Sequence, residues 1–294
     1  MYYYIVNPAA GGGRVSRIQD EIRSALREYG IAGEWLKTLG PGDVSRLARQ
    51  GLESGATTIV AVGGDGTLGE IIRSLYGESG VAIGVIPTGE RNSLATLLGV
   101  RALREAVPIL AARKLEQIDL GEIGGRYFVG SVGIGFEAAH PVGRGGGGST
   151  PFRDRVRKLP AYLKASREWK ASEASITLDD ITYLKAPVFN LTISNSDIRS
   201  GLGMVAVDPQ DRRLDLRITS RTGTSSMIRG LPGYLSGEGG AAEETSLFRA
   251  SKIEIGSPTP LPVHIDGEPG GTTPVTVRVA DKRVQLIVGR ERQF

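Results

Sequence analysis

Three strand-like runs in the first third of the chain each end in a glycine-rich turn, and a helical pattern follows each turn. The runs are Tyr2–Val6, Thr57–Val62 and Val81–Ile86. Apolar residues after the first turn recur at spacings of three and four, which predicts an amphipathic helix. Helical segments are also predicted at Leu68–Leu75 and Ser93–Leu98. Because alternating strands and helices build a mostly parallel sheet with helices on both faces, we expect a three-layer α/β domain.

The pattern changes near residues 115–122, after which strand-like segments follow one another closely. Such a run favours an antiparallel β-sandwich. Helical patterns interrupt it only at Asp154–Lys170 and Ser225–Tyr234, and the glycine-rich Gly143–Ser149 predicts a mobile loop. We place the first domain at residues 1–120 and the second at 121–294, with a last strand that can return to the first domain. The predicted strands are Arg126–Val132, Ser175–Leu178, Ile181–Leu184, Val188–Ser194, Leu214–Ile218, Ser251–Ile255, Val275–Val279 and Val284–Val288.

Cysteine is absent, and the only two histidines, His140 and His264, are far apart in the chain. The lack of cysteine excludes disulfides, thiolate nucleophiles and cysteine-ligated zinc or iron–sulfur sites. Two distant histidines exclude a metal helix of the HExxH type. Any chemistry must therefore use carboxylates, hydroxyls, backbone amides and cations.

The formal net charge is +4, and one short segment supplies more than all of it. Residues 153–170 contain seven cations and two anions. This segment indicates peripheral contact with an anionic membrane surface, although a solvated helix face explains it equally well. The chain starts without a signal-peptide pattern and has no apolar run long enough to span a membrane, so we expect a cytoplasmic protein that associates peripherally with membranes. No motif indicates nucleic-acid binding.

The turn Gly63–Thr67 at a strand–helix junction is the clearest chemical signal. Glycines there let the backbone approach a phosphate, and the helix N-terminus offers free N–H groups and a positive dipole end. Asp65 would then hold a metal ion, a substrate hydroxyl or a ribose, or it would simply cap a helix. Two more small-residue turns, Asn7–Arg14 and Pro87–Ser93, follow strands at the edge where open α/β sheets bind ligands. Together the three turns favour a nucleotide pocket, although none is a Walker loop or a GxGxxG motif.

The segments NPAAGGGR (7–14), GGDGTLGE (63–70) and PTGERNSLA (87–95) resemble the diacylglycerol kinase catalytic-domain family, which includes bacterial lipid kinases, sphingosine kinases and ceramide kinases. The resemblance continues through SVGIGFEA (131–138), Asn195, DPQDRRLD (208–215) and HIDGE (264–268), and so spans nearly the whole chain. It implies an ATP- and Mg²⁺-dependent kinase of a lipid hydroxyl. It also implies that the pocket lies between a nucleotide-binding domain and a β-sandwich domain that binds the lipid.

Phosphoryl transfer needs a carboxylate that orients or deprotonates the attacking hydroxyl, and Asp65, Asp266 and Glu268 are plausible catalytic residues. By resemblance, Glu268 matches the general base proposed for the family. Taken alone, the segment Asp266–Glu268 also fits an exposed turn between strands. The residues expected around ATP are Asn7, Gly11, Gly13, Arg14, Thr38, Gly63, Gly64, Asp65, Gly66, Thr67, Glu70, Gly89 and Asn92.

A magnesium site is implied at the Asp211 side chain, with the carbonyls of Asp208 and Arg213 beside it; ordinary turn chemistry explains the same residues. The sequence departs from the family at three positions, one of which is Arg212 in place of the glycine of the family's DG-x-LD segment. Gly69 stands where the family has asparagine, and Glu90 stands where it has threonine or serine. A dry carboxylate at Glu90 would repel a triphosphate, and solvent or a metal ion would weaken that repulsion.

Three functions remain in competition. The leading hypothesis is a lipid kinase. A soluble-substrate kinase resembling NAD kinase shares the GGDG motif, but the opening NPAAGGGR and the late DGE argue against it. A catalytically silent nucleotide or lipid sensor is suggested by Gly69 and Glu90. The identity of the lipid and the formation of a homodimer are left open by the sequence.

Overall fold

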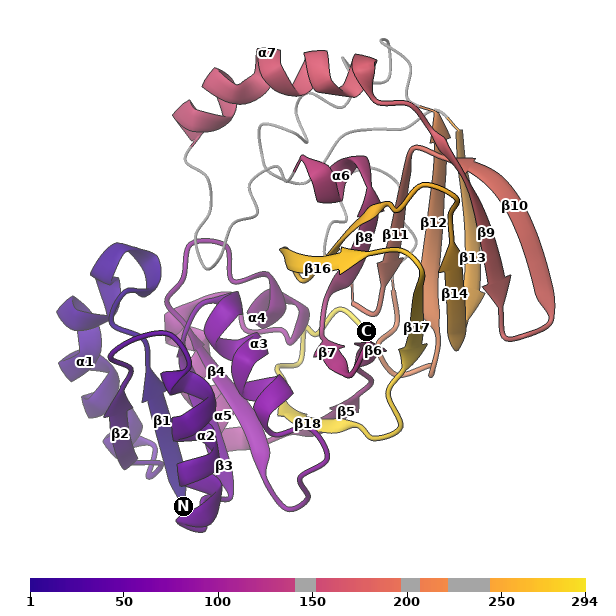
Figure 1. Ribbon diagram of the computed structural model, residues 1–294. Coiled ribbons are helices and arrows are strands. Elements are labelled where there is room, and N and C mark those ends of the chain that lie inside the picture. Colours follow the sequence, from indigo (N-terminus) through magenta and orange to yellow (C-terminus); the bar gives the residue numbers. More distant parts are fainter. Residues whose placement is uncertain (141–151, 197–206, 222–243) are drawn as a thin grey trace. The chain divides into compact units, whose positions relative to one another are not determined.

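The computed structural model describes residues 1–140, 152–196, 207–221 and 244–294 (Figure 1). The chain divides into two compact units. The first consists of Met1–Asp119 and Asp281–Phe294, and the second of Leu120–Ala280. The predicted helix at Ser225–Tyr234 and the predicted loop at Gly143–Ser149 lie outside the described residues.

The first unit is built on one six-stranded sheet with the strand order β2-β1-β3-β4-β18-β5. All neighbouring strands pair in parallel except β5, which is antiparallel to β18. Every residue of β3 and β4 is buried, as expected for strands covered on both faces. The last predicted strand therefore belongs to this unit. The strands are β1 (Tyr2–Val6), β2 (Gly33–Lys37), β3 (Thr58–Gly63), β4 (Ala82–Pro87), β5 (Leu115–Ile118) and β18 (Val284–Ile287).

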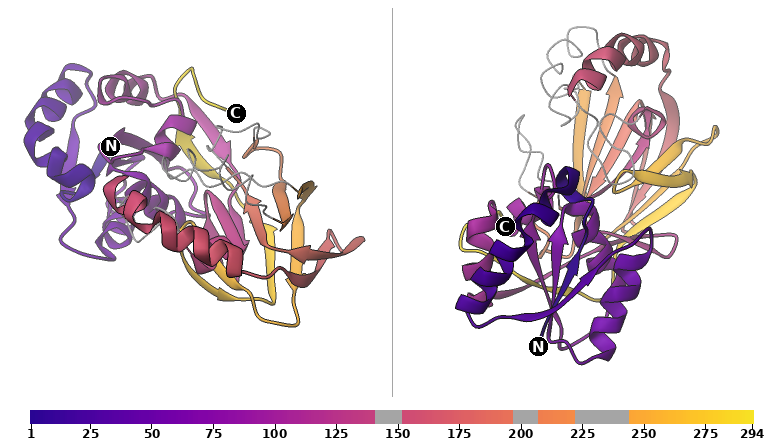
Figure 2. Two further views of the ribbon diagram at one scale, coloured as in Figure 1. Left: turned by 90° about the horizontal axis from the view of Figure 1, so that it is seen from above. Right: turned by 90° about the vertical axis from the view of Figure 1, so that its left-hand side faces the viewer.

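Helices cover both faces of this sheet, as the right-hand view of Figure 2 shows. A Cβ atom on Gly51 of α2 would lie 2.7 Å from the ring of Tyr3, so α2 packs on the face that Tyr3 presents. A Cβ atom on Gly84 would lie 2.3 Å from a methyl group of Leu110, so α5 packs on the other face. The two faces are opposite because Tyr3 is in register, through β3, with Ile83, the neighbour of Gly84. The helices are α1 (Arg14–Glu28), α2 (Asp43–Glu53), α3 (Asp65–Ser74), α4 (Ser93–Leu97) and α5 (Leu103–Ala112), with a short 3₁₀ turn at Ala10–Gly13.

The second unit packs two six-stranded antiparallel sheets around one apolar cluster. Their strand orders are β10-β9-β14-β17-β6-β7 and β13-β12-β11-β8-β15-β16. The predicted fold class, an α/β domain followed by an antiparallel β-sandwich, is therefore confirmed. The strands are β6 (Gly121–Ile123), β7 (Arg126–Phe128), β8 (Ser131–Gly135), β9 (Ser172–Leu178), β10 (Thr182–Val188), β11 (Asn190–Ser194), β12 (Leu214–Arg221), β13 (Glu244–Ala250), β14 (Lys252–Gly256), β15 (Pro262–Ile265), β16 (Glu268–Thr272) and β17 (Val275–Val279); the helices are α6 (Phe136–Ala139) and α7 (Phe152–Glu168).

Two predicted strands are interrupted in the structure. Val188–Ser194 contains the break at Phe189 between β10 and β11. Arg126–Val132 was expected to be continuous, but β7 ends at Phe128 and β8 begins at Ser131. A turn separates them because the amides of Val129 and Gly130 bind a carboxylate from a distant part of the chain instead of a neighbouring strand. The chain therefore passes from one sheet of the sandwich to the other within what looks like a single apolar run.

Candidate active site

The first two predicted phosphate turns meet where β1 and β3 end. The Asn7 side chain follows β1, and its Nδ2 donates a hydrogen bond of 3.1 Å to Oγ1 of Thr67 in the first turn of α3. A Cβ atom on Gly63 would lie 2.6 Å from the same oxygen, so a larger residue would have to displace Thr67. Because Thr67 is buried, it connects the two turns from within the unit.

The third turn packs against the other two through main-chain atoms. A Cβ atom on Gly11 would lie 2.1 Å from the carbonyl oxygen of Thr88, and one on Gly89 would lie 2.6 Å from Cα of Gly64. Gly11 also has a φ of +57°, which favours glycine. A phosphate that approaches these turns can therefore reach the backbone closely, as in other glycine-rich phosphate sites.

A helix N-terminus completes this site. Helix α3 begins directly after Gly64 and has no side-chain cap. Its first N–H groups have no partner within the helix and form the positive end of its dipole. Among the residues that the structure describes, the buried Oγ1 of Thr88 also has no hydrogen-bond partner. With Gly63, Gly66 and Thr67 at the same junction, these groups fit the phosphates of a nucleotide.

Gly13 and Arg14 form the start of α1. Gly13 has a φ of +81° at the N-cap of the helix, and Arg14 is its exposed first residue. An exposed guanidinium at this edge of the sheet is available for a phosphate oxygen. The placement is consistent with the predicted nucleotide role of both residues, which stays a prediction.

Asp65 and Asn92 shape the turn after β4. The two carboxylate oxygens of Asp65 accept hydrogen bonds from the first amides of α4, Ser93 N at 2.9 Å and Leu94 N at 2.8 Å. Asn92 closes the turn on itself, since its Oδ1 accepts from Gly89 N at 2.9 Å and its Nδ2 donates to Gly89 O at 2.8 Å. Asp65 thus caps α4 instead of its own helix. The catalytic role of Asp65 and the nucleotide contact of Asn92 stay predictions.

Two of the departures from the family pattern have different surroundings. A Cβ atom on Gly69 would lie 3.3 Å from Nη1 of Arg73, so the Arg73 side chain covers the space beside this glycine. Glu90 is exposed, and solvent therefore screens its charge. The repulsion expected between Glu90 and a triphosphate is weakened accordingly.

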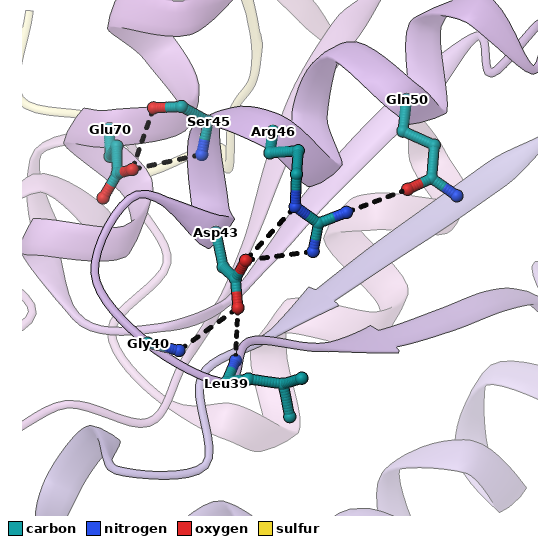
Figure 3. A network of polar contacts seen from close by, with 7 residues as sticks. All are labelled: Leu39, Gly40, Asp43, Ser45, Arg46, Gln50 and Glu70. Carbon is teal, nitrogen blue, oxygen red and sulfur yellow. Dashed lines mark hydrogen bonds and ion pairs between the residues drawn. The ribbon is translucent and has the colours of Figure 1, made fainter.

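The loop after β2 carries Thr38, which was predicted on the nucleotide side. Asp43 organises this loop: its Oδ2 accepts from Leu39 N at 2.6 Å and from Gly40 N at 3.1 Å, while its Oδ1 faces Arg46 at 3.0 Å (Figure 3). The hydrogen bond from Leu39, followed by that from Arg46, holds the pKa of Asp43 below its usual value. The sequence reasoning missed Asp43, although an aspartate directly after a Gly-Pro-Gly turn is itself a signal for such a cap.

We expect the variant Asp43→Asn to lose stability in a pH-dependent way. A carboxyl whose pKa is lowered by folding stabilises the fold above its unfolded pKa, and this contribution disappears as the pH falls through the folded pKa. The melting temperature of the variant should therefore lie below that of the wild type at pH 6, and the gap should close below about pH 4. Thermal melts across this range test the expectation; a gap that is constant with pH would contradict it.

Glu70 is a residue of α3, and its side chain reaches the first turn of α2. Its Oε1 accepts from Ser45 N at 3.1 Å and from Ser45 Oγ at 2.8 Å (Figure 3). Ser74 Oγ adds a 2.9 Å hydrogen bond to Ser45 Oγ. Glu70 therefore ties α3 to the first turn of α2. Its predicted place around the ATP phosphates stays a prediction, and these contacts give it a structural task as well.

The DGE segment forms a tight turn between β15 and β16 in the second unit. Asp266 has a φ of +49°, and its carboxylate accepts hydrogen bonds from Val129 N at 3.0 Å, Gly130 N at 2.9 Å and Ser131 N at 3.0 Å. These contacts favour a structural task for Asp266 over the predicted acid–base role. Glu268, in contrast, has a side chain that is 55% exposed, so its carboxylate can reach a ligand.

The predicted magnesium loop offers oxygen donors, but its carboxylate also lies close to an arginine side chain of the protein. Asp211 Oδ1 accepts from Arg213 N at 2.9 Å, and its Oδ2 lies 3.4 Å from Arg249, whose nearer partner is Asp215 at 2.8 Å. The described part of the chain contains no cluster of three or more His, Cys, Asp or Glu side chains that could hold a metal ion. The predicted set instead uses one carboxylate with the carbonyls of Asp208 and Arg213, and this donor chemistry fits Mg²⁺.

Two family profiles match the chain. The diacylglycerol kinase catalytic domain matches residues 1–123, and the YegS C-terminal NAD kinase beta sandwich-like domain matches residues 130–288. The matched segments correspond closely to the two units of the structure.

Curated relatives carry matching names. A diacylglycerol kinase of Bacillus subtilis (strain 168) is 23% identical over 98% of this chain and 96% of its own length. A probable YegS-like lipid kinase of Pseudomonas aeruginosa PAO1 is 29% identical over 85% of this chain and 83% of its own length.

Solved structures share the fold. A crystal structure of a diacylglycerol kinase from Bacillus anthracis has a TM-score of 0.71 at 20% identity and covers 98% of this chain and 97% of its own. An NAD kinase from Archaeoglobus fulgidus in complex with ATP has a TM-score of 0.58 at 14% identity, covering 100% and 96%. With the two profiles spanning nearly its whole length, the chain belongs to the diacylglycerol kinase catalytic-domain family, in the form with a YegS-type C-terminal domain, and is a lipid kinase.

Proposed function

We propose that the chain transfers the γ-phosphate of ATP to the hydroxyl of a lipid such as diacylglycerol or a sphingoid-type alcohol. The observation that carries the proposal is the meeting of three glycine-rich turns at the N-terminus of α3, where only main-chain atoms fit between them. We assign ATP binding to residues 1–120 and the lipid to residues 121–294.

For phosphoryl transfer the protein mainly has to position ATP and the acceptor hydroxyl and to supply one general base. The turns around Gly64 and Gly89 would hold the phosphates through main-chain N–H groups. Glu268 would orient the lipid hydroxyl and accept its proton as the hydroxyl oxygen bonds to the γ-phosphorus and ADP leaves. The exposure of the Glu268 carboxylate supports this role.

The decisive experiment is ATP turnover with Mg²⁺ against lipid alcohols in mixed micelles, with phosphorylated lipid detected directly. A labelled lipid supports the kinase and names its acceptor. Phosphorylation of NAD instead would support the soluble-substrate kinase. ATP binding without any product would support a silent sensor and overturn the proposal.

We further propose that Asp211, with the carbonyls of Asp208 and Arg213, binds Mg²⁺ and thereby stabilises the second unit. A ligand that binds only the folded state at ten times its Kd adds about 1.4 kcal/mol. For a domain of this size that corresponds to a rise in melting temperature of roughly 3–6 °C. Melts in EDTA and in Mg²⁺ should show this rise in the wild type but not in Asp211→Asn. Equal melting temperatures of the wild type with and without Mg²⁺ would refute the site.

We also propose that α7 contacts an anionic membrane surface. In the part of the chain that the structure describes, no helix is long and apolar enough to cross a membrane. Tyr162 of α7 and Trp169, the residue that follows the helix, pack against Phe136 of α6, with ring centroids 5.2 Å and 5.8 Å away. The helix and the residues just after it also expose cations, each worth about 1 kcal/mol near anionic lipid. These cations are Arg157, Lys158, Lys164, Arg167 and Lys170. Flotation with anionic vesicles but not with neutral ones is expected; equal flotation with both would overturn the proposal.

A further inference from the structure

Arg126, the first residue of β7, bridges the two residues that begin β16. Its Nη1 donates a hydrogen bond of 2.9 Å to the carbonyl oxygen of Pro269, and its Nη2 lies 3.3 Å from Oε2 of Glu268. One planar guanidinium thus contacts both the main chain and the carboxylate at the same point of the strand. The position of the Glu268 carboxylate relative to its own backbone is fixed by this double contact.

The turn that follows β7 is unusually well held. All three amides of Val129–Ser131 donate to the Asp266 carboxylate. The carbonyl oxygens of the same turn also accept hydrogen bonds: Val129 from Asn195 Nδ2 at 3.1 Å, Gly130 from Asn195 N at 2.9 Å, and Ser131 from Asp266 N at 2.9 Å. Every main-chain polar group of the turn therefore has a partner. Gly130 is required there, because a Cβ atom would lie 2.9 Å from Asp266 Oδ1.

This turn and the DGE turn form one rigid frame with Arg126 across it. Asp266 belongs to the DGE turn and binds the turn after β7, so the ends of β7 and β15 are joined directly. Arg126 then connects the other end of β7 to the start of β16. Because both attachment points are held by hydrogen bonds, the guanidinium reaches Glu268 from a fixed base.

We do not expect the ion pair between Arg126 and Glu268, taken alone, to contribute much to the free energy of folding. Arg126 is 48% exposed and Glu268 is 55% exposed, and ion pairs between such side chains contribute little to folding. Catalysis is far more sensitive to position, since a displacement of about 1 Å can cost on the order of a hundredfold in rate. A contact that adds little to the free energy of folding can therefore still have a large effect on the catalytic rate.

We propose that Arg126 is a positioning residue that sets the Glu268 carboxylate toward the acceptor hydroxyl. The proposal rests on the proposed role of Glu268 as the general base. It assigns Arg126 no contact with substrate: the guanidinium acts only through Glu268 and Pro269. It also gives Asp266 a place in the same frame, as the residue that joins the two turns.

The test compares Arg126→Ala with Arg278→Ala in the full-length protein. Arg278 is a matched control because it lies in the same unit, is 49% exposed and pairs with Glu122 at 3.0 Å, as Arg126 pairs with Glu268. Both variants should melt within about 2 °C of the wild type, since each removes the surface contacts of an arginine side chain that is about half exposed. Values of kcat and KM for ATP and for the acceptor lipid are then measured in mixed micelles.

We expect Arg126→Ala to lower kcat by about ten- to a hundredfold with KM for ATP changed by less than twofold. Arg278→Ala should match the wild type. Added methylguanidinium should restore part of the activity of Arg126→Ala, and Arg126→Lys should lie between the two, because a lysine supplies charge without the planar fork. A purely structural arginine would show neither rescue. A kcat for Arg126→Ala within twofold of the control overturns the proposal.

Two further measurements separate this proposal from the proposed function. If Glu268→Gln is inactive while Arg126→Ala is fully active, the result supports Glu268 as the general base and overturns the positioning role of Arg126. If the wild type phosphorylates no lipid, the proposed function falls and takes the catalytic part of the proposal with it. Hydrogen exchange then decides the structural part: amides of residues 266–270 should exchange at least tenfold faster in Arg126→Ala, and unchanged exchange overturns it.

Discussion

Replacing Glu268 by glutamine is expected to lower kcat for lipid phosphorylation by about 10²–10⁴-fold, the usual contribution of a general base. Glutamine keeps the shape of the side chain and can still face Arg126, but it cannot accept the proton of the attacking hydroxyl. The KM for ATP should change by less than twofold, since the phosphates are assigned to turns of the first unit. The melting temperature should stay the same, because the Glu268 side chain is 55% exposed.

A matched control makes this result specific. Glu254 is also exposed and paired with a cation, Lys252 at 2.8 Å, but it lies on β14 in the other sheet of the second unit. Glu254→Gln should leave kcat unchanged. Steady-state kinetics of both variants, with phosphorylated lipid as the readout, decide the matter. If Glu268→Gln retains more than half of the wild-type kcat, Glu268 is not the base.

Local patterns predicted the elements whose signal lies in adjacent residues. The buried strand β1 has the bounds expected from its apolar run, and α3 and β4 differ from prediction by a few residues at their ends. Two neighbouring elements, β2 and α2, were missed. Strand β2 is largely exposed, so its sequence lacks an apolar run. The buried face of α2 consists of Val44, Leu47, Ala48 and Gly51, which recur at spacings of three and four, so the periodic signal for this helix was present and was overlooked.

For the candidate site, too, the sequence predicted the local features but not the contacts between distant residues. The three glycine-rich turns were predicted because a strand, small residues and a helix follow one another within a few positions. What each carboxylate binds could not be predicted, because the partners are distant in sequence. Asp65 binds amides of α4, Glu70 binds Ser45, and Asp266 binds Val129–Ser131. The signal for these contacts is geometric and exists only once the strands are in register.

The second large effect is expected from a single methyl group on the first glycine-rich turn. Gly11→Ala places a Cβ atom 2.1 Å from the carbonyl oxygen of Thr88, where two main chains meet and no side chain can move aside. One of the turns must therefore shift. Since the turn that carries Thr88 also places Gly89 against Gly64, we expect the affinity for ATP to fall at least tenfold and the stability to fall by about 3 kcal/mol.

The variant Gly12→Ala separates the effect of the steric clash with Thr88 from the free-energy cost of placing alanine at a positive φ. Gly12 has nearly the same left-handed conformation as Gly11, with φ of +64° against +57°, but a Cβ atom on Gly12 would meet no atom of the described residues within 4 Å. Both variants carry the penalty of alanine at positive φ, about 1–2 kcal/mol, and only Gly11→Ala adds the collision. Calorimetric ATP titration and thermal melts of the two variants therefore give the collision by difference. Equal losses in both would mean that the close approach of Gly11 to Thr88 is not what holds the phosphate turns together, and the nucleotide site would have to be built from the other two turns alone.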